Sequence, residues 1–167
     1  MRMKAALRFA ARDRRIPVVM AADDSDSAVV DVERFDLEPD RPLYHGLVDE
    51  DELRDLPAEP SADQRIAMLD ALLGTAFGPR TQSSFQQVGA RIPQWSQLAT
   101  GATVSGAAIT YVARRILTGQ SMPSGRHRVC LDALLDPDFS SPEAAAGRRR
   151  TSSGYSRDIA TVLETLA

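Results

Sequence analysis

Hydrophobic and polar positions in the first part of the chain predict a helix followed by two strands. Residues 2–14 are rich in strong helix formers with arginines spread among them, which predicts a helix. The apolar run at 16–20 follows after a very short turn and predicts a buried strand, and the alternation at 28–33 predicts a second strand. Because a helix that leads so directly into an apolar strand is typical of the αβ half of a βαβ unit, we expect a parallel sheet.

The middle of the chain predicts a long connection and then a helix. Residues 35–60 hold four prolines and show no sustained period, so we expect a connection with a helical turn around 50–56. Ser61 and Gln64 have the spacing of a capping box, in which each side chain bonds the backbone amide of the other residue. They therefore predict the start of an amphipathic helix that runs to about residue 77.

The longest expected helix covers roughly residues 94–118, after a short helix that begins near residue 81. Pro93 stands at its start and Gly119 just past its end, where these residue types favour helix boundaries. Its first half is made mostly of small residues, so we expect it to pass close to a sheet or to another helix. Gly106 costs a helix interior about 1 kcal/mol relative to alanine, and we expect this glycine to allow the close contact.

The last part of the chain predicts one more strand and a separate tail. Residues 126–131 alternate and predict a strand, and 132–138 predict a short helical turn or loop. We expect an α/β domain over residues 1–135, a flexible linker over 136–154 and a short helix over 155–167.

Composition is that of an ordinary globular domain. The chain has 167 residues, of which 43% are hydrophobic and 26% charged. It contains no apolar run long enough to span a membrane and no apolar leader after its charged first residues, so we expect a cytoplasmic protein with no membrane partner. One cysteine, Cys130, excludes an internal disulfide and a cysteine-rich zinc site made by this chain alone.

Charge is unevenly distributed, although the formal net charge is only −3. Residues 1–20 carry six basic groups and one acid, whereas residues 23–60 carry fourteen acids and three arginines. The two segments either neutralise each other within one fold or form charged surfaces for nucleic acid or membrane. Aromatic residues are not interleaved with the arginines in the pattern that base stacking needs, so we favour neutralisation and expect no nucleic-acid partner.

Three carboxylates and one histidine are the candidate site residues. Asp23, Asp24 and Asp26 follow the first predicted strand at its carboxyl end, where open α/β sheets place their ligand crevices. They either hold Mg²⁺ or a polar partner, or form a solvated turn of common composition. His45 stands beside a glycine in a loop, where it either acts in a site or bonds the backbone. We expect Cys130 to be a small buried side chain within a strand.

Motifs for phosphate binding and nucleophilic catalysis are absent from the sequence. It has neither of the two glycine-rich phosphate loops, Gly-x-Gly-x-x-Gly and Gly-x4-Gly-Lys-Ser/Thr. It also lacks the Gly-x-Ser-x-Gly elbow and any Cys-x-x-Cys pair. We therefore expect no catalytic residue, metal site or cofactor site made by this chain alone.

Three stretches of sequence nevertheless resemble a known family. They are KAALRFAARDRRIPVVMA at 4–21, DVERFDLEPDRPLYHG at 31–46, and the small-residue helix with its exit at 96–119. Together they resemble the ThiF/MoeB/HesA family of adenylating enzymes, which are related to ubiquitin-activating enzymes. The similarity covers about residues 1–135 and is closest to actinobacterial members, in which a ThiF-like domain can be fused to a nitroreductase-like domain.

The resemblance implies a Rossmann-like sheet whose N-terminal half binds ATP and Mg²⁺ and whose C-terminal half shapes the acceptor side. Members of the family adenylate a carboxylate, often that of a ubiquitin-like or sulfur-carrier protein. The family's glycine-rich loop, its nucleotide-binding Arg and Lys and its Mg²⁺-binding Asp precede the helix with which this chain begins. The zinc motifs are missing, Cys130 does not match the catalytic cysteine, and only the loop at 23–26 matches a position near the active site, by its location.

We therefore expect an incomplete Rossmann-like sheet that lacks the nucleotide-binding half, from a truncated or split reading frame, and that does not adenylate a substrate alone. Its open strand edge would pair with the missing N-terminal half or with a second copy of the chain. Two alternatives stay open. One is a non-catalytic interaction module that docks a basic partner through the acidic segment at 23–60, and the other is a subunit that a separate N-terminal half completes.

Overall fold

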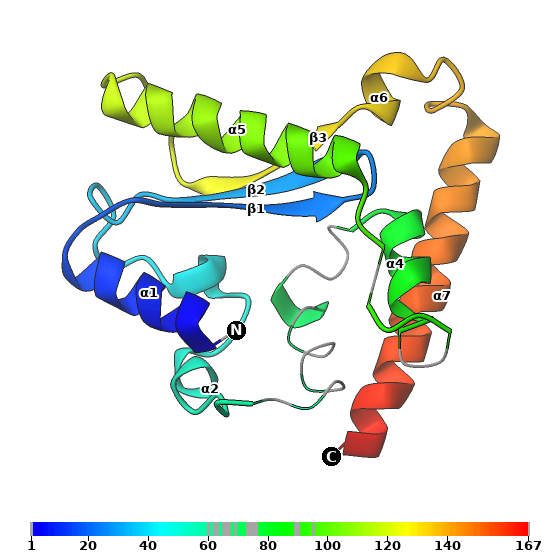
Figure 1. Cartoon of the computed structure of the whole chain (residues 1–167), viewed down its shortest axis with the longest axis horizontal. Helices are drawn as coiled ribbons and strands as arrows, with labels where there is room; N and C mark the ends of the chain where they lie inside the picture. The colour runs from blue at the N-terminus through cyan, green and yellow to red at the C-terminus, as the bar shows by residue number, and fades with distance from the viewer. Residues whose placement is uncertain are drawn as a thin grey trace.

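The computed structural model describes residues 2–59, 61, 64, 68, 70–72, 77–88, 91–94 and 96–166, with side chains up to residue 154. Within these ranges the elements are α1 (Arg2–Asp13), β1 (Val18–Asp24), β2 (Ser27–Glu33), the 3-10 helix η1 (Leu43–Gly46), α2 (Glu50–Arg54), α4 (Pro79–Phe85), α5 (Ala99–Leu117), β3 (Gly125–Cys130), α6 (Asp132–Leu135) and α7 (Pro142–Leu166). Figure 1 shows α1 and α5 on opposite sides of the sheet, and α7 beside α4 at one end of it.

The three described strands form an antiparallel sheet in the order β1-β2-β3. Asp24 pairs with Ser27, so only Ser25 and Asp26 connect β1 to β2. Such a short connection can join only antiparallel neighbours, and the parallel pairing that we expected is therefore wrong for these strands. The coarser prediction of a mixed α/β fold is confirmed.

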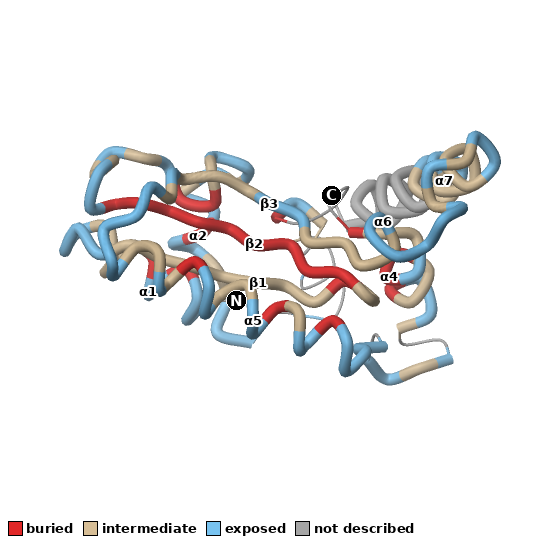
Figure 2. Tube along the Cα trace, turned by 90° about the horizontal axis from the view of Figure 1, so that it is seen from above, coloured by how far each residue is buried: buried red, intermediate tan, exposed pale blue. Residues whose placement is uncertain are grey.

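Strand β2 is the centre of the fold, and all seven of its residues are buried (Figure 2). Ala28, Val30 and Val32 face α5 and belong to one hydrophobic cluster with side chains of that helix. Val29 faces the other side, in a second cluster that includes Ala5 of α1. Helices thus cover both faces of the sheet, which leaves the two outer strands as its edges.

Helix α5 approaches the sheet at its first turn. A Cβ atom built on Gly101 would lie 2.3 Å from the backbone carbonyl oxygen of Ser25, in the turn between β1 and β2. Gly106, by contrast, has open space within 4 Å of its Cβ position. The prediction of a close contact is thus confirmed for the helix but wrong for Gly106. The helix begins at Ala99, later than expected, and Gly119 follows its end with a φ of +70°.

The tail differs most from the sequence prediction. Helix α7 runs over Pro142–Leu166, so the expected linker at 136–154 is helical from Pro142 onward, and α7 rather than α5 is the longest helix described. Its start carries ordinary capping signals, because the amide of Ala144 donates to the Ser141 hydroxyl at 3.1 Å and proline occupies the first turn. The expected helix at 155–167 is the continuation of α7, while the division into domains stays a prediction.

The capping box is confirmed by two reciprocal bonds. The amide of Ser61 donates to Oε1 of Gln64 at 2.9 Å, and the amide of Gln64 donates to the Ser61 hydroxyl at 3.1 Å. Most of the helix that this box predicts, over 61–77, lies outside the described residues. The first helix, the strands at 28–33 and 126–131 and the short helices near 50–56 and 81 agree with the structure. The strand expected at 16–20 instead runs over Val18–Asp24, so Asp23 and Asp24 lie within it and not after it.

Candidate functional site

Basic residues of α1 pair with acidic residues of the segment that follows β1. Arg8 donates from Nε to Oε2 of Glu33 at 2.6 Å, and both side chains are buried. Arg12 makes a bidentate pair with Glu50 at 2.5 and 2.6 Å. The hydrogen bonds from Arg12 lower the pKa of Glu50. These two pairs offset part of the charge of the basic helix and of the acidic segment within the fold.

Glu33 also fixes the loop that carries His45. Its Oε1 accepts the backbone amide of Tyr44 at 2.7 Å, and the guanidinium of Arg8 stacks over the Tyr44 ring at 4.0 Å. Tyr44 and His45 have φ values of +51° and +60°, and Gly46 follows at +76°. A left-handed conformation costs about 1–2 kcal/mol for an ordinary L-residue, so the contacts of Glu33 hold a strained turn in place.

His45 lies against Asp31 of β2 and not against the carboxylates of the hairpin. Its Nε2 is 3.3 Å from Oδ1 of Asp31, and its Nδ1 is 3.0 Å from a guanidinium nitrogen of Arg41. Because a guanidinium only donates, Nδ1 accepts here, and the proton of a neutral ring lies on Nε2, toward Asp31.

Asp31 is a buried anion with two partners. Arg126 of β3 binds both of its oxygens, at 2.7 and 2.8 Å, from the position directly opposite on the sheet. Burial raises the pKa of Asp31, but the contacts from Arg126 and His45 outweigh it and lower the pKa to about 2. This carboxylate therefore stays charged at neutral pH and orients Arg126.

The hairpin carboxylates make structural contacts of their own. Asp24 is fully buried, and its two oxygens accept the amide of Gly78 at 2.8 and 2.9 Å and pair with Arg128. Asp26 accepts a bond from Arg80 at 3.0 Å and one from the Thr100 hydroxyl.

The four predicted site residues therefore do not form one site. Asp24 pairs with Ser27 at the hairpin end, whereas His45 contacts Asp31, four residues further along β2, which is about 13 Å at the usual rise of a strand. Asp23 stands next to Asp24 in β1. Among the described residues, no three His, Cys, Asp or Glu side chains come together to hold a metal ion, so the residues in hand do not fit Mg²⁺.

A cavity of about 930 Å³ lies between the sheet and α7, and sequence reasoning missed it. We call it the arginine groove, because five arginines line it: Arg80, Arg126, Arg128, Arg148 and Arg149. The sequence did contain a signal, since arginines two apart on a strand face the same side of a sheet. Arg148 and Arg149 stood in the segment that the sequence predicted to be a linker, and Arg80 stood just before the short helix expected near residue 81.

Cys130 lines the same groove and is only partly buried. The prediction that it lies in a strand is correct, but the prediction that it is buried is wrong. It lies opposite Ser27 at the end of β3. His127 is exposed and also belongs to the lining of this groove. None of the helices in the described part of the chain is both long and apolar enough to cross a membrane.

Comparison with known proteins adds one relative. The chain is 38% identical over 137 residues to the uncharacterized protein MT1398 of Mycobacterium tuberculosis (strain CDC 1551 / Oshkosh), an alignment that covers 80% of this chain. It covers 18% of that protein, so the chain spans less than a fifth of the length of this relative. No protein-family model matches the chain. No solved structure matches it either.

Proposed function

We propose that this chain is the C-terminal portion of a ThiF-type adenylating domain, which activates a carboxylate with ATP once the remainder of the domain is present. The observation that carries the proposal is the packing of the three stretches that resemble the family. The stretch at 4–21 forms α1 and most of β1, the stretch at 31–46 forms the end of β2 and η1, and the stretch at 96–119 contains α5. All three pack around one sheet, through the two hydrophobic clusters on its faces.

The proposal assigns further strands to the outer edge of β1. Within the described sheet, β1 has β2 as its only neighbour, and the chain corresponds to a small part of a much longer relative. Strands added there would extend the three antiparallel strands into a Rossmann-like sheet. The nucleotide and Mg²⁺ would bind in that added half, since the described residues do not fit the metal. The carboxylate of a ubiquitin-like or sulfur-carrier protein is the proposed substrate.

The charge pairs disfavour the first alternative, an interaction module that docks a basic partner through its acidic segment. Asp24, Asp26, Asp31, Glu33 and Glu50 each have an arginine partner within the chain. The charge of these five carboxylates is offset within the chain, which leaves only the other acids of the segment for a basic partner. The second alternative, a subunit completed by a separate chain, differs from the proposal only in how the two halves are encoded.

ATP binding by the mycobacterial relative and by this chain tests the proposal. We expect the full-length relative to bind a fluorescent ATP analogue in the presence of Mg²⁺, and the 167-residue chain alone to bind it at least tenfold more weakly. A form of the relative without the region that matches this chain should lose the binding or weaken it at least tenfold. A full-length relative that does not bind ATP would contradict the proposal, and ATP binding by this chain alone with the affinity of the full-length relative would contradict the assignment of the nucleotide to the added half.

A further inference from the structure

We propose that the arginine groove binds a small molecule that carries a phosphate group. The groove is lined by residues of β3, the start of α4 and the first turns of α7, and by Val29, which faces the side of the sheet opposite α5. This inference does not depend on the proposed adenylating function, because the groove is built by described residues of this chain alone.

Two strand arginines form a rigid floor. Arg126 is held by the buried Asp31 and Arg128 by the buried Asp24, so neither guanidinium must be ordered when a ligand arrives. Arg126 uses Nε and one terminal nitrogen on Asp31, which leaves its other terminal nitrogen available to donate.

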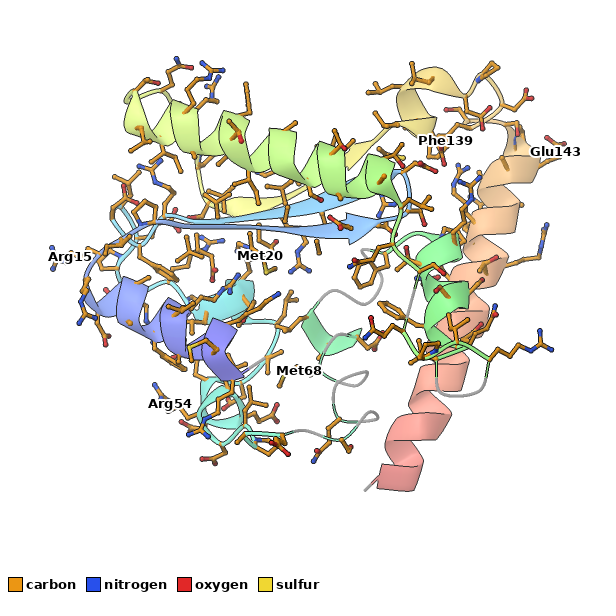
Figure 3. The ribbon with its side chains drawn as sticks, viewed as in Figure 1. Arg15, Met20, Arg54, Met68, Phe139 and Glu143 are labelled. Atoms are coloured by element: carbon orange, nitrogen blue, oxygen red, sulfur yellow. The ribbon has the colours of Figure 1, made fainter. Side chains whose placement is uncertain are left out.

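The wall on α7 supplies two further guanidinium groups. Arg148 donates from one terminal nitrogen to the backbone oxygen of Phe139 at 2.7 Å and stacks on the Phe139 ring at 3.9 Å. This stacking fixes the plane of the guanidinium while its Nε and second terminal nitrogen remain for a ligand. Arg149 is exposed next to it, and Figure 3 shows Phe139 between α6 and α7.

Three of the five arginines already pair with an aspartate of the chain, so the attraction for an anion comes mainly from Arg148 and Arg149, for which no acidic partner is found among the described residues. Five arginines line the groove together with three aspartates, Asp24, Asp132 and Asp136. Asp24 lies beneath the floor with no exposed surface, so a ligand meets the other two at most. Guanidinium groups bind phosphate through paired N–H donors.

The size of the groove indicates a ligand larger than phosphate itself. Its volume of about 930 Å³ lies within the usual range of small-molecule sites. Phe139 contributes partly exposed apolar surface to the lining, next to the buried core residues Val29 and Phe77. The groove therefore fits a phosphate ester whose organic part lies against these side chains, and a phosphate at the arginines.

Isothermal titration of the 167-residue chain with pyrophosphate tests this proposal with a probe that is not a nucleotide. Ionic strength is held constant with NaCl, because nonspecific charge effects are screened by salt. We expect saturable binding, and a double variant with Arg148→Gln and Arg149→Gln should bind at least tenfold more weakly. The control is Arg150→Gln, which removes one charge from the next position of α7, outside the groove lining, and should change the affinity less than twofold. It is compared with the single variants Arg148→Gln and Arg149→Gln, which also remove one charge each.

Three results would overturn the proposal. One is the absence of saturable pyrophosphate binding by the unmodified chain. Another is an equal loss in the Arg150→Gln control, which would show a general charge effect rather than a site. The third is equal or tighter binding of citrate, which would assign the groove to carboxylates. Circular dichroism and melting temperatures of all variants show whether each one is folded, and Arg126→Gln provides a second, independent variant on the floor of the groove.

Discussion

Two glycines of α5 predict opposite effects of the same substitution. At Gly101 an added Cβ atom would lie 2.3 Å from the carbonyl oxygen of Ser25, which is roughly 1 Å closer than the usual contact of a carbon with a carbonyl oxygen. At Gly106 the added atom meets nothing within 4 Å. Both glycines lie in the same helix, so the difference in their surroundings decides whether alanine raises or lowers the free energy of unfolding.

The magnitudes follow from packing and helix propensity. Gly106→Ala removes the conformational freedom of a glycine within a helix and should raise the free energy of unfolding by about 1 kcal/mol. Gly101→Ala gains part of the same term, but it forces α5 away from the hairpin, and overpacking of this kind costs about 1–3 kcal/mol. Movement of the first turn also weakens the bond from Thr100 to Asp26. We expect Gly101→Ala to lower the free energy of unfolding by about 1–3 kcal/mol.

Urea denaturation followed by circular dichroism at 222 nm measures both variants. The expected difference between them is about 2–4 kcal/mol, which corresponds to roughly 4–16 °C in melting temperature for a chain of this size. Equal denaturant slopes would show that the two variants unfold from comparably compact states. If both substitutions stabilise the chain to the same extent, the close approach of α5 to the hairpin is refuted.

Three further predictions concern buried charge and the sheet edge. Asp31→Asn should lower the free energy of unfolding at pH 7, and its difference from the unmodified chain should shrink by about 2 kcal/mol as the pH falls from 5 to 2. The reason is that the pKa of Asp31 is lowered from 3.8 to about 2, so its stabilising charge is lost in that range. A difference that stays constant at all pH values would contradict this. Glu33→Gln should lower the free energy of unfolding by about 3–5 kcal/mol, because it leaves the buried Arg8 without a charged partner. In the same urea denaturation assay, Glu38→Gln, which removes a half-exposed pair with Arg41, should lower it by less than about 1 kcal/mol. The isolated chain should dimerise or aggregate through the open edge of β1, and a monomer at all concentrations in analytical ultracentrifugation would count against that assignment.

Local structure could be predicted from the sequence, because its signals lie within a few residues of each other. The capping box at Ser61 and Gln64 and the glycine after α5 are of this kind. The antiparallel pairing could not be predicted from such signals. Strand β1 continues through Asp24 because Gly78 and Arg128, both distant in sequence, satisfy a carboxylate that reads locally as part of a polar turn.

The candidate site shows the same limit. The position of His45 in a loop was informative, but its partner Asp31 stood in a strand, and Arg126 lies 95 residues further along the chain. Likewise, the arginines of α7 belonged to a segment whose composition resembles a linker. Only the capping by Ser141 and the packing of α7 against α4 turn that segment into one wall of a groove.

The bond between Tyr44 and Glu33 has a consequence for the motions of the molecule. Tyr44 lies in a connection outside the sheet, where backbone amides ordinarily exchange their hydrogen with solvent quickly. Its amide, however, donates to a carboxylate of the fully buried strand β2. We therefore expect this amide to exchange only when the sheet itself opens. The exchange rate of the loop that carries His45 should then match that of the buried strand rather than those of the surrounding loops.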